Sequence, residues 1–274
     1  MPPKDEQYQL GDDGFVVERV GAWAKRKHKL LTDYIQVSRY ARAKYNRRSG
    51  AAYIDVFCGP GRLLIRDTTT YIDGSPVAAF NQGQASLAPF SSIEISDMNT
   101  ERLNAAHMRL KNLNAPVEVT PGPALKAMER IVQRVHQRGL HFVFLDPHNL
   151  GALSFDLFKI LKNLENVDIL VHVSIADLQR NVDLFTIKQF DTFAPGWSDA
   201  IDHKNMSKTA LRSGVLNYWY DQVARLGLTK AKHSEEIRGP GNQRLYWLSL
   251  FSRDNLAHKL WTAVSSAAKQ SEMF

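Results

Sequence analysis

The chain has a single cysteine, Cys58, among its 274 residues, so it can build neither a disulfide framework nor an all-cysteine zinc or iron–sulfur site of its own. No apolar run approaches the roughly 18 residues that a membrane span needs. The opening MPPKDEQYQ lacks the apolar core of a signal peptide, and the nine histidines show no H-E-x-x-H or other metal-binding spacing. These absences predict a cytoplasmic protein without a membrane partner or a metal site.

Charge is concentrated near the beginning of the chain. The whole sequence has a net charge of +7, but between residues 18 and 50 ten lysines and arginines stand against two acidic residues. A basic stripe on one element is typical of a polyanion contact and predicts binding to RNA or DNA. A solvated helix face rich in lysine and arginine is the alternative. The residues that we expect to contact phosphates are Arg39, Arg42, Arg47 and Arg48.

Beyond residue 50 the chain alternates between strand and helix patterns. Short apolar runs predict strands at residues 51–57, 89–96, 115–120, 141–147 and 167–174, with helical patterns between most of them. Five such strands imply a parallel, doubly wound α/β sheet. Near the end, HSEEIR and RLYWLSLF flank a Gly-Pro-Gly-Asn turn, which predicts an antiparallel hairpin.

The region before the first strand has a different pattern. Apolar residues recur every three to four positions over residues 15–48 without a proline, which predicts helix, whereas residues 62–74 have no regular pattern. We therefore expect a basic helical N-terminal extension over residues 1–50 and a single domain over residues 51–274. Five parallel strands plus a C-terminal antiparallel hairpin match the seven-stranded, Rossmann-like layout of methyltransferases that use S-adenosyl-L-methionine (SAM), which makes SAM the expected cofactor.

A glycine-rich turn, CGPGR, follows the first of these strands. In doubly wound sheets, ligands bind outside the carboxyl ends of the strands, and a glycine backbone can approach them closely. Phe57 stands where dinucleotide enzymes have their first glycine, which argues against an NAD-dependent enzyme. An ordinary strand–helix turn is the alternative. The expected cofactor residues in this segment are Asp55, Phe57, Gly59 and Gly61.

An acidic residue, Glu94, lies near the end of the second strand. A carboxylate there can accept hydrogen bonds from both ribose hydroxyls of an adenosine cofactor, so we expect Glu94 to bind the cofactor. Ser96 and Asp97 lie just beyond it and are competing candidates, and a solvated glutamate is the alternative.

The fourth strand ends in Asp146-Pro147-His148-Asn149. Amino-directed methyltransferases place an acidic or amide residue, prolines and an aromatic residue here, and the acceptor oxygens position the target amine. His148 replaces the second proline, and no aromatic residue follows directly. Together with Arg180, these four residues are the expected catalytic group; a capped turn at the end of a strand is the alternative.

Cytosine carbon-5 methylation needs a cysteine nucleophile after a proline on the fourth strand, and this chain has none there. Cys58 itself is more typical of a small packed residue than of a catalyst. Trp219, Trp247 and Trp261 sit in apolar patterns, which places them in the predicted core.

Several motifs together resemble the three-Cys-motif partner protein (TcmP) family, a bacterial group similar to SAM-dependent methyltransferases. They include W-x-x-x-K-x-x-L-L-x-x-Y from Trp23, YIDVFCGPGR from Tyr53, FVFLDPHNLG from Phe142, VDILVHVSIADLQRN from Val167 and LYWLSLFSRDNLAHKLW from Leu245. Family members usually have phenylalanine after the Asp-Pro, where this sequence has His148. The resemblance implies a partner protein that carries a three-cysteine motif.

The favoured function is a SAM-dependent methyltransferase acting on a nitrogen of a nucleic-acid base. One alternative is a non-catalytic methyltransferase-like adaptor for the three-cysteine-motif partner. Another is a small-molecule or protein methyltransferase whose basic segment contacts only the partner.

Overall fold

The computed structural model describes residues 7–181, 187–203 and 205–270, and its centre is a seven-stranded sheet. The strands in spatial order are β10 (Thr229–Arg238), β11 (Arg244–Ser252), β9 (Asn166–Ser174), β8 (Leu140–Leu145), β3 (Ala51–Asp55), β6 (Ser92–Ile95) and β7 (Val117–Val119). Strand β11 runs antiparallel to β9 and β10, and the neighbouring pairs from β9 to β7 are parallel. The predicted doubly wound α/β fold with a C-terminal antiparallel hairpin is confirmed.

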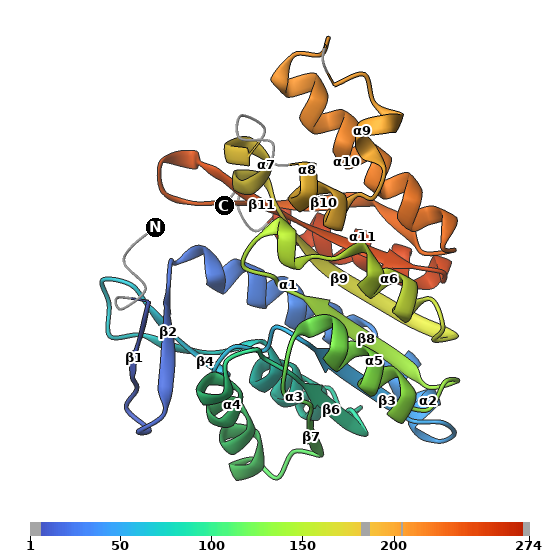
Figure 1. Ribbon diagram of the computed structural model, residues 1–274. Coiled ribbons are helices and arrows are strands. Elements are labelled where there is room, and N and C mark those ends of the chain that lie inside the picture. The colour runs from blue at the N-terminus through green and yellow to red at the C-terminus, as the bar shows by residue number, and fades with distance from the viewer. Residues whose placement is uncertain (1–6, 182–186, 204, 271–274) are drawn as a thin grey trace.

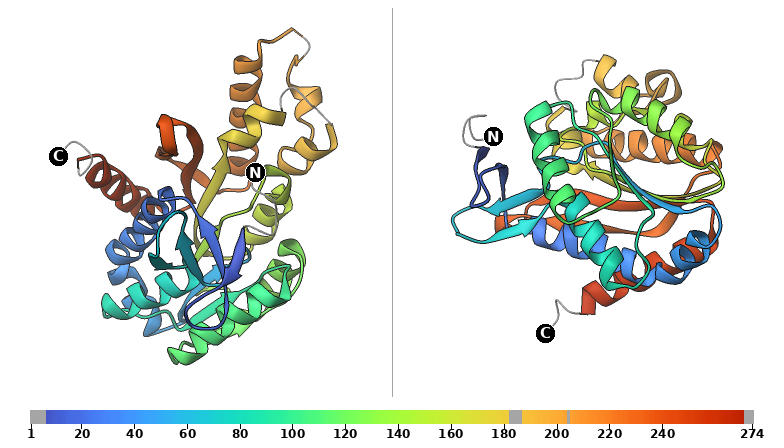
Figure 2. Two further views of the ribbon diagram at one scale, coloured as in Figure 1. Left: turned by 90° about the vertical axis from the view of Figure 1, so that its left-hand side faces the viewer. Right: turned by 90° about the horizontal axis from the view of Figure 1, so that it is seen from below.

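Helices cover both faces of this sheet (Figures 1 and 2). On one face lie α1 (Trp23–Val37), α3 (Ser75–Ala85), α4 (Thr100–Asn112) and α11 (Asn255–Gln270). On the other lie α5 (Ala124–Arg134), α6 (Phe155–Leu161), α8 (Ile187–Phe193), α9 (Trp197–Ala200) and α10 (Lys208–Arg225). Helix α2 (Arg39–Asn46) continues from α1, and α7 (Ile175–Asn181) follows β9.

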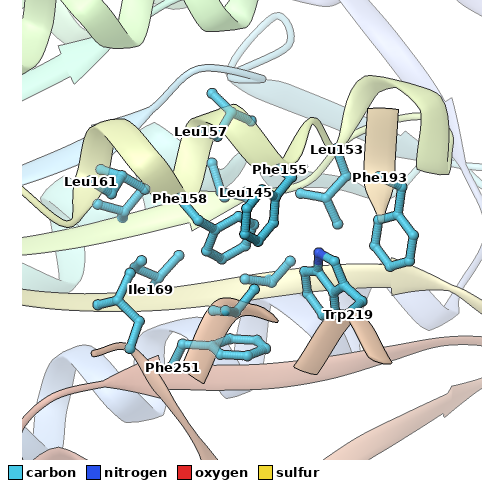
Figure 3. Packing of buried hydrophobic residues seen from close by; sticks show 14 of the residues in the cluster. Leu145, Leu153, Phe155, Leu157, Phe158, Leu161, Ile169, Phe193, Trp219 and Phe251 are labelled. Atoms are coloured by element: carbon cyan, nitrogen blue, oxygen red, sulfur yellow. The ribbon is translucent and has the colours of Figure 1, made fainter. Parts of the chain in front are cut away.

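Two apolar clusters separate the sheet from its two helix layers, because successive residues of a strand point to opposite faces. In β8, for example, Val143 belongs to one cluster and Phe144 to the other. Figure 3 shows part of the first cluster, where Phe158 of α6 and Trp219 of α10 meet with their rings nearly perpendicular and their centroids 5.4 Å apart. Trp219 and Trp261 are fully buried, as predicted for core residues, whereas Trp247 is half-buried.

A second, four-stranded sheet corrects two expectations about secondary structure. Its strands in spatial order are β1 (Tyr8–Leu10), β2 (Val16–Val20), β4 (Arg62–Ile65) and β5 (Tyr71–Asp73). The predicted helix from residue 15 is wrong at its start, because residues 16–20 form strand β2, which pairs antiparallel with β1 and in parallel with β4. Residues 62–74, expected to be irregular, contain the β4–β5 hairpin. Short apolar runs such as these do not distinguish helix from strand until the pairing partner is known.

Residues 7–50 are connected to the rest of the chain by long-range contacts. Strand β2 pairs with β4, and α1 contributes Leu30, Leu31 and Tyr34 to the apolar cluster beneath the large sheet. Arg109 of α4 donates hydrogen bonds to the Asp13 carboxylate and to the backbone oxygen of Val16. The division of the chain at residue 50 remains a prediction, but the extension is packed onto the domain along most of its described length.

Candidate active site at the carboxyl edge of the sheet

The glycine turn lies where β3 ends, and its two glycines have different roles. Both have positive φ values, 57° for Gly59 and 77° for Gly61. A Cβ on Gly61 would stand 3.1 Å from the Cα of Ala106 on α4, so this glycine is needed for close packing. A Cβ on Gly59 would meet only a Glu18 carboxylate oxygen, at 3.8 Å. The space beside Gly59 is therefore the part of the turn that a ligand can occupy.

Asp55, the last residue of β3, is fully buried behind this turn. Its carboxyl group accepts hydrogen bonds from the Ser75 hydroxyl at 2.6 Å, the Tyr53 hydroxyl at 3.1 Å and the backbone N–H of Phe57 at 3.1 Å. Burial raises the pKa of Asp55 to about 7, against the lowering effect of these hydrogen bonds. Asp55 thus holds the turn in place and changes charge near neutral pH.

Asp97 is the carboxylate that faces the glycine turn. It follows β6, and its Oδ2 accepts a hydrogen bond from the backbone N–H of Gly59 at 3.2 Å. Its Oδ1 accepts from the backbone N–H of Asn99 at 2.8 Å and from Arg102 at 2.7 Å. The side chain of Met98, directly after it, is 75% exposed. A carboxylate and an exposed apolar side chain therefore stand together at the carboxyl edge of the sheet.

The expected contact between Glu94 and the cofactor stays a prediction, and the Glu94 carboxylate is already bonded to two side chains of the protein. Glu94 is one residue before the end of β6, 2% exposed, and its carboxylate is held by Ser92 at 2.5 Å and by Arg134 of α5. Both Glu94 and Arg134 line a cavity of about 360 Å³ beside Gly50 and Ser92, where β3 and β6 begin. The Glu94 side chain thus lines a cavity that reaches the amino ends of these strands, although its backbone pairs with Ile54, the residue before Asp55. Of the competing candidates, Asp97 is the one whose side chain contacts the turn. Ser96 contacts the turn through its backbone oxygen, which accepts from the N–H of Cys58, while its hydroxyl lies 3.4 Å from the backbone oxygen of Gly122.

Asp146 is already bound by two side chains of the protein. Lys27 of α1 forms an ion pair with its Oδ2, and Nδ1 of His172 on β9 lies 2.5 Å from its Oδ1. Burial alone would raise the pKa of Asp146, but the Lys27 charge and the His172 hydrogen bond outweigh it and hold the pKa well below its usual range. Although burial opposes its charge, the same ion pair holds the pKa of Lys27 above its ordinary value. Asp146 is thus ionised in the folded protein, and the Lys27 ammonium group beside it remains protonated.

The residues after Asp146 lie apart from this ion pair. Pro147 is buried, whereas His148 is exposed, with Nε2 3.4 Å from a guanidinium nitrogen of Arg102. The Asn149 side chain caps the following turn by accepting a hydrogen bond from the backbone N–H of Ala152 at 3.0 Å. Arg180 belongs to α7, but its side chain lies outside what the structure describes. Among the described side chains of the predicted catalytic group, only Asp146 is brought into a half-buried polar cluster, and its partners were missed.

Those missed partners left a signal in the sequence. His172 is the one polar residue within the apolar run ILVHV of β9, and Lys27 lies in the W-x-x-x-K motif. Neither can be assigned to Asp146 without knowing that β8 and β9 are neighbours and that α1 passes over their ends. A third side chain beside Asp146 and His172 that the sequence did not reveal is Tyr246, where the pairing of β11 with β9 begins. The centroid of its ring lies 3.9 Å from that of His172.

The four arginines expected to bind phosphates do not form one surface. Arg42 is only 2% exposed and donates hydrogen bonds to the Ala88 backbone oxygen and to the hydroxyls of Ser38 and Ser86. Its expected phosphate contact is therefore wrong. Arg47 and Arg48 are exposed, and Arg39 is half-buried on the side of Tyr40. Because they immediately precede β3, Arg47 and Arg48 lie near the amino edge of the sheet.

Other kinds of site find little support in the described part of the chain. Within residues 7–181, 187–203 and 205–270, no three or more histidine, cysteine, aspartate or glutamate side chains are grouped as metal ligands. No helix among the same residues is long and apolar enough to cross a membrane. Cys58 is buried, and burial raises the pKa of its thiol, which is typical of a packed residue and not of a nucleophile.

Comparisons with known proteins give distant structural likenesses. A scan against models of protein families and a search of curated proteins both find no match. Among solved structures, the O-methyltransferase TomG of Streptomyces achromogenes, solved with SAM, is 14% identical over 84% of this chain and 80% of its own, with a TM-score of 0.48. An O-methyltransferase of Bacillus cereus, solved with the demethylated product SAH, is 11% identical over 83% and 80%, with a TM-score of 0.47.

Proposed function

We propose that this protein is a SAM-dependent methyltransferase. The observation that carries the proposal is the contact between Asp97 and the backbone N–H of Gly59, where two adjacent parallel strands end. A ligand beside Gly59 would meet a carboxylate suited to ribose hydroxyls and an exposed methionine suited to a flat base. The TcmP resemblance of the sequence motifs agrees with this assignment.

The residues present fit an adenosine-containing sulfonium cofactor. The open side of Gly59 gives backbone access, and Asp97 would hold the ribose, with Met98 against the adenine. Asp55 fixes the turn through the backbone N–H of Phe57 and can carry the negative charge that a methionine ammonium group prefers. When bound, SAM supplies an electrophilic methyl group.

The contacts of Asp146 weigh against a base nitrogen as the target. An amino-directed enzyme needs a free acceptor there, but each Asp146 oxygen already accepts from Lys27 or His172. We therefore propose methyl transfer as the reaction without retaining the nitrogen of a nucleic-acid base as the favoured target.

The test is titration calorimetry of SAH into the full chain and two charge-removing variants. Asp97→Asn keeps the size of the side chain and should weaken SAH binding roughly tenfold or more, as expected for a lost charge-assisted hydrogen bond. Glu94→Gln is the matched control, a buried carboxylate of the same strand region, and should leave the dissociation constant unchanged. No SAH binding to folded wild-type protein would refute the proposed function and favour the adaptor.

A nucleic-acid partner is a second proposal, and it depends on the exposed end of α2. Lys44, Arg47 and Arg48 are exposed there in the described structure. These cations lie near the amino edge of the sheet, so they would anchor an extended polyanion and not the reacting group itself. The three-cysteine-motif partner is likewise a proposal, supported only by the resemblance of the sequence.

A further inference from the structure

The two ring nitrogens of His172 differ in their contacts, because Nδ1 is hydrogen-bonded to Asp146 and Nε2 is not. Nδ1 lies 2.5 Å from Asp146 Oδ1, and the Lys27 ion pair fixes that carboxylate from its other oxygen. Among the residues that the structure describes, no hydrogen-bond partner is found for Nε2. Since Asp146 is ionised, the proton of a neutral imidazole belongs on Nδ1, which leaves the lone pair of Nε2 available as a base.

Tyr246 provides a second, independent observation beside this histidine. Its ring packs against His172 with 3.9 Å between centroids, and the side chain is 5% exposed. The buried Tyr246 hydroxyl has no hydrogen-bond partner within the described residues. A buried hydroxyl without a partner costs free energy comparable to a lost hydrogen bond, so it points to a ligand group that completes it.

We propose that the substrate is an alcohol or phenol whose hydroxyl group meets Nε2 of His172 and the hydroxyl of Tyr246. This inference rests on the proposed function, since it names the substrate class and the base of the same site. His172 is the catalytic base, and Tyr246 donates to the substrate oxygen. Asp146 and Lys27 are positioning residues, because they act through His172.

The proton balance of this assignment is simple. Nε2 accepts the hydroxyl proton as the substrate oxygen forms its bond to the methyl carbon, and the electron pair of the breaking S–CH₃ bond stays on sulfur. The imidazolium that forms is stabilised by the Asp146 carboxylate. Lys27 cannot serve as the base, because its ion pair with Asp146 keeps it protonated.

The charges around the ring favour a neutral histidine at the start of the reaction. Burial lowers the pKa of His172, against the raising effect of Asp146 on β8. Lys27 on α1 lowers it further, Asp177 on α7 raises it, and Tyr246 on β11 is itself kept protonated by burial. A base must be unprotonated before it acts, and this environment provides that near neutral pH.

The first experiment needs no substrate. Nitrogen-15 NMR of histidine-labelled full-length protein, with the His172 signal assigned through His172→Asn, should show the Nδ1–H tautomer and a pKa below the ordinary value of about 6.5. Asp146→Asn should shift the population toward the other tautomer. An Nε2–H tautomer in the wild type, or a pKa above 7, would overturn the proposal.

The second experiment identifies the acceptor atom with methyl-labelled SAM and a panel of phenols, aliphatic alcohols and amines. Transfer to a hydroxyl group should fall at least 100-fold in His172→Ala, as for loss of a general base, and recover partly with added imidazole. Tyr246→Phe should lower the rate about tenfold, as expected for one lost hydrogen bond to the substrate. His136→Ala, which changes an exposed histidine at the amino edge, is the control that should keep the wild-type rate.

Two results separate this inference from the proposed function. Labelled amines formed equally by wild type and His172→Ala would overturn the assignment of base and substrate while leaving the methyltransferase in place. Calorimetry with SAH on His172→Ala should give a dissociation constant within a few-fold of the wild type. Loss of that binding would show that His172 holds the cofactor and overturn its assignment as the base.

Discussion

The large sheet holds two carboxylates paired with cations, Glu94 on β6 and Asp146 after β8, and the two pairs differ in what surrounds them. Glu94 is buried, while its partner Arg134 is 39% exposed in its side chain. At the carboxyl edge, Lys27 and Asp146 have side-chain exposures of only 14% and 18%, and His172 joins them. If the Glu94 charge is lost, the Arg134 guanidinium group can turn toward water. The Lys27 ammonium group cannot, so the ends of β8 and β9 keep a costly charge cluster that a structural role alone does not require.

The strongest test of this comparison removes each carboxylate charge without changing its size. Asp146→Asn leaves the Lys27 ammonium group buried without a counter-charge and should lower the free energy of unfolding by about 3–5 kcal/mol. Glu94→Gln leaves a guanidinium group that can turn to water and should cost only about 1 kcal/mol. Urea unfolding of both variants measures the difference.

A double variant provides the control for that result. Lys27→Met combined with Asp146→Asn removes both charges and should recover most of the lost stability. If Asp146→Asn and Glu94→Gln lower the free energy of unfolding equally, the two ion pairs do not differ in the way that their exposures indicate.

A second prediction concerns Asp55, whose hydrogen-bond partners among the described residues are two hydroxyls and a backbone N–H. Its pKa is raised to about 7 by burial, so between pH 4 and 7 the folded state holds a proton that the unfolded state has released. Wild type should therefore lose stability relative to Asp55→Asn as pH rises through that window, by an amount on the order of 3 kcal/mol. Unfolding of both proteins at about pH 4.5, near the lower end of the window, and at about pH 7.5, just above it, measures this difference.

Taking the difference in stability between wild type and Asp55→Asn removes the contributions of groups that titrate in both proteins. Burial lowers the pKa of both His28 and His141 to about 4, which makes wild type gain stability with rising pH, but the variant has the same two histidines. Equal pH dependence of the two proteins would show that Asp55 ionises normally in the folded state.

The smallest predicted effect on stability is at three arginines of the basic segment, of which Arg39 is half-buried and Arg47 and Arg48 are exposed. Changing Arg39, Arg47 and Arg48 together to glutamine should alter the free energy of unfolding by only tenths of a kcal/mol each. If they bind phosphates, affinity for RNA or DNA should fall several-fold, and the plot of log affinity against log salt should flatten by about one unit per lost contact. Fluorescence anisotropy at several salt concentrations measures both.

Arg42→Gln is the matched variant of that experiment. It removes the buried hydrogen bonds to Ala88, Ser38 and Ser86, so it should destabilise the fold by about 1–3 kcal/mol without a specific effect on the salt slope. An unchanged affinity and slope in the triple variant would leave the basic segment as a solvated or protein-docking surface.

The large sheet was predictable because its signal is local. Each of the five parallel strands, three to nine residues long, has a turn or a helix beside it, and five alternations leave few possible topologies. The small sheet was not predictable in the same way. Its strands β2 and β4 are separated by more than forty residues, and pairing across that distance leaves no periodic mark in either segment.

The site was predictable as a location but not as a set of contacts. The turn with Asp55, Gly59 and Gly61 was found because glycines at positive φ have a sequence signature. The choice between Glu94 and Asp97 depended on where β6 ends, and a boundary error of two residues moves a side chain along the sheet. Arg42 was misplaced for a related reason, since a stripe of charges does not show which member turns inward to bond backbone oxygens.

The position of β11 between β9 and β10 has a consequence for synthesis on the ribosome. Strand β10 is made first, yet in the described sheet its only neighbour is β11, the last strand to emerge. Until then β9 has an open edge, which is a surface that other nascent chains can pair with. Tyr246 belongs to the same strand, β11. The pairing of β11 with β9 therefore covers the open edge and brings Tyr246 against His172 at the same time. A chain stopped before residue 246 would therefore be both prone to aggregate and without a finished site.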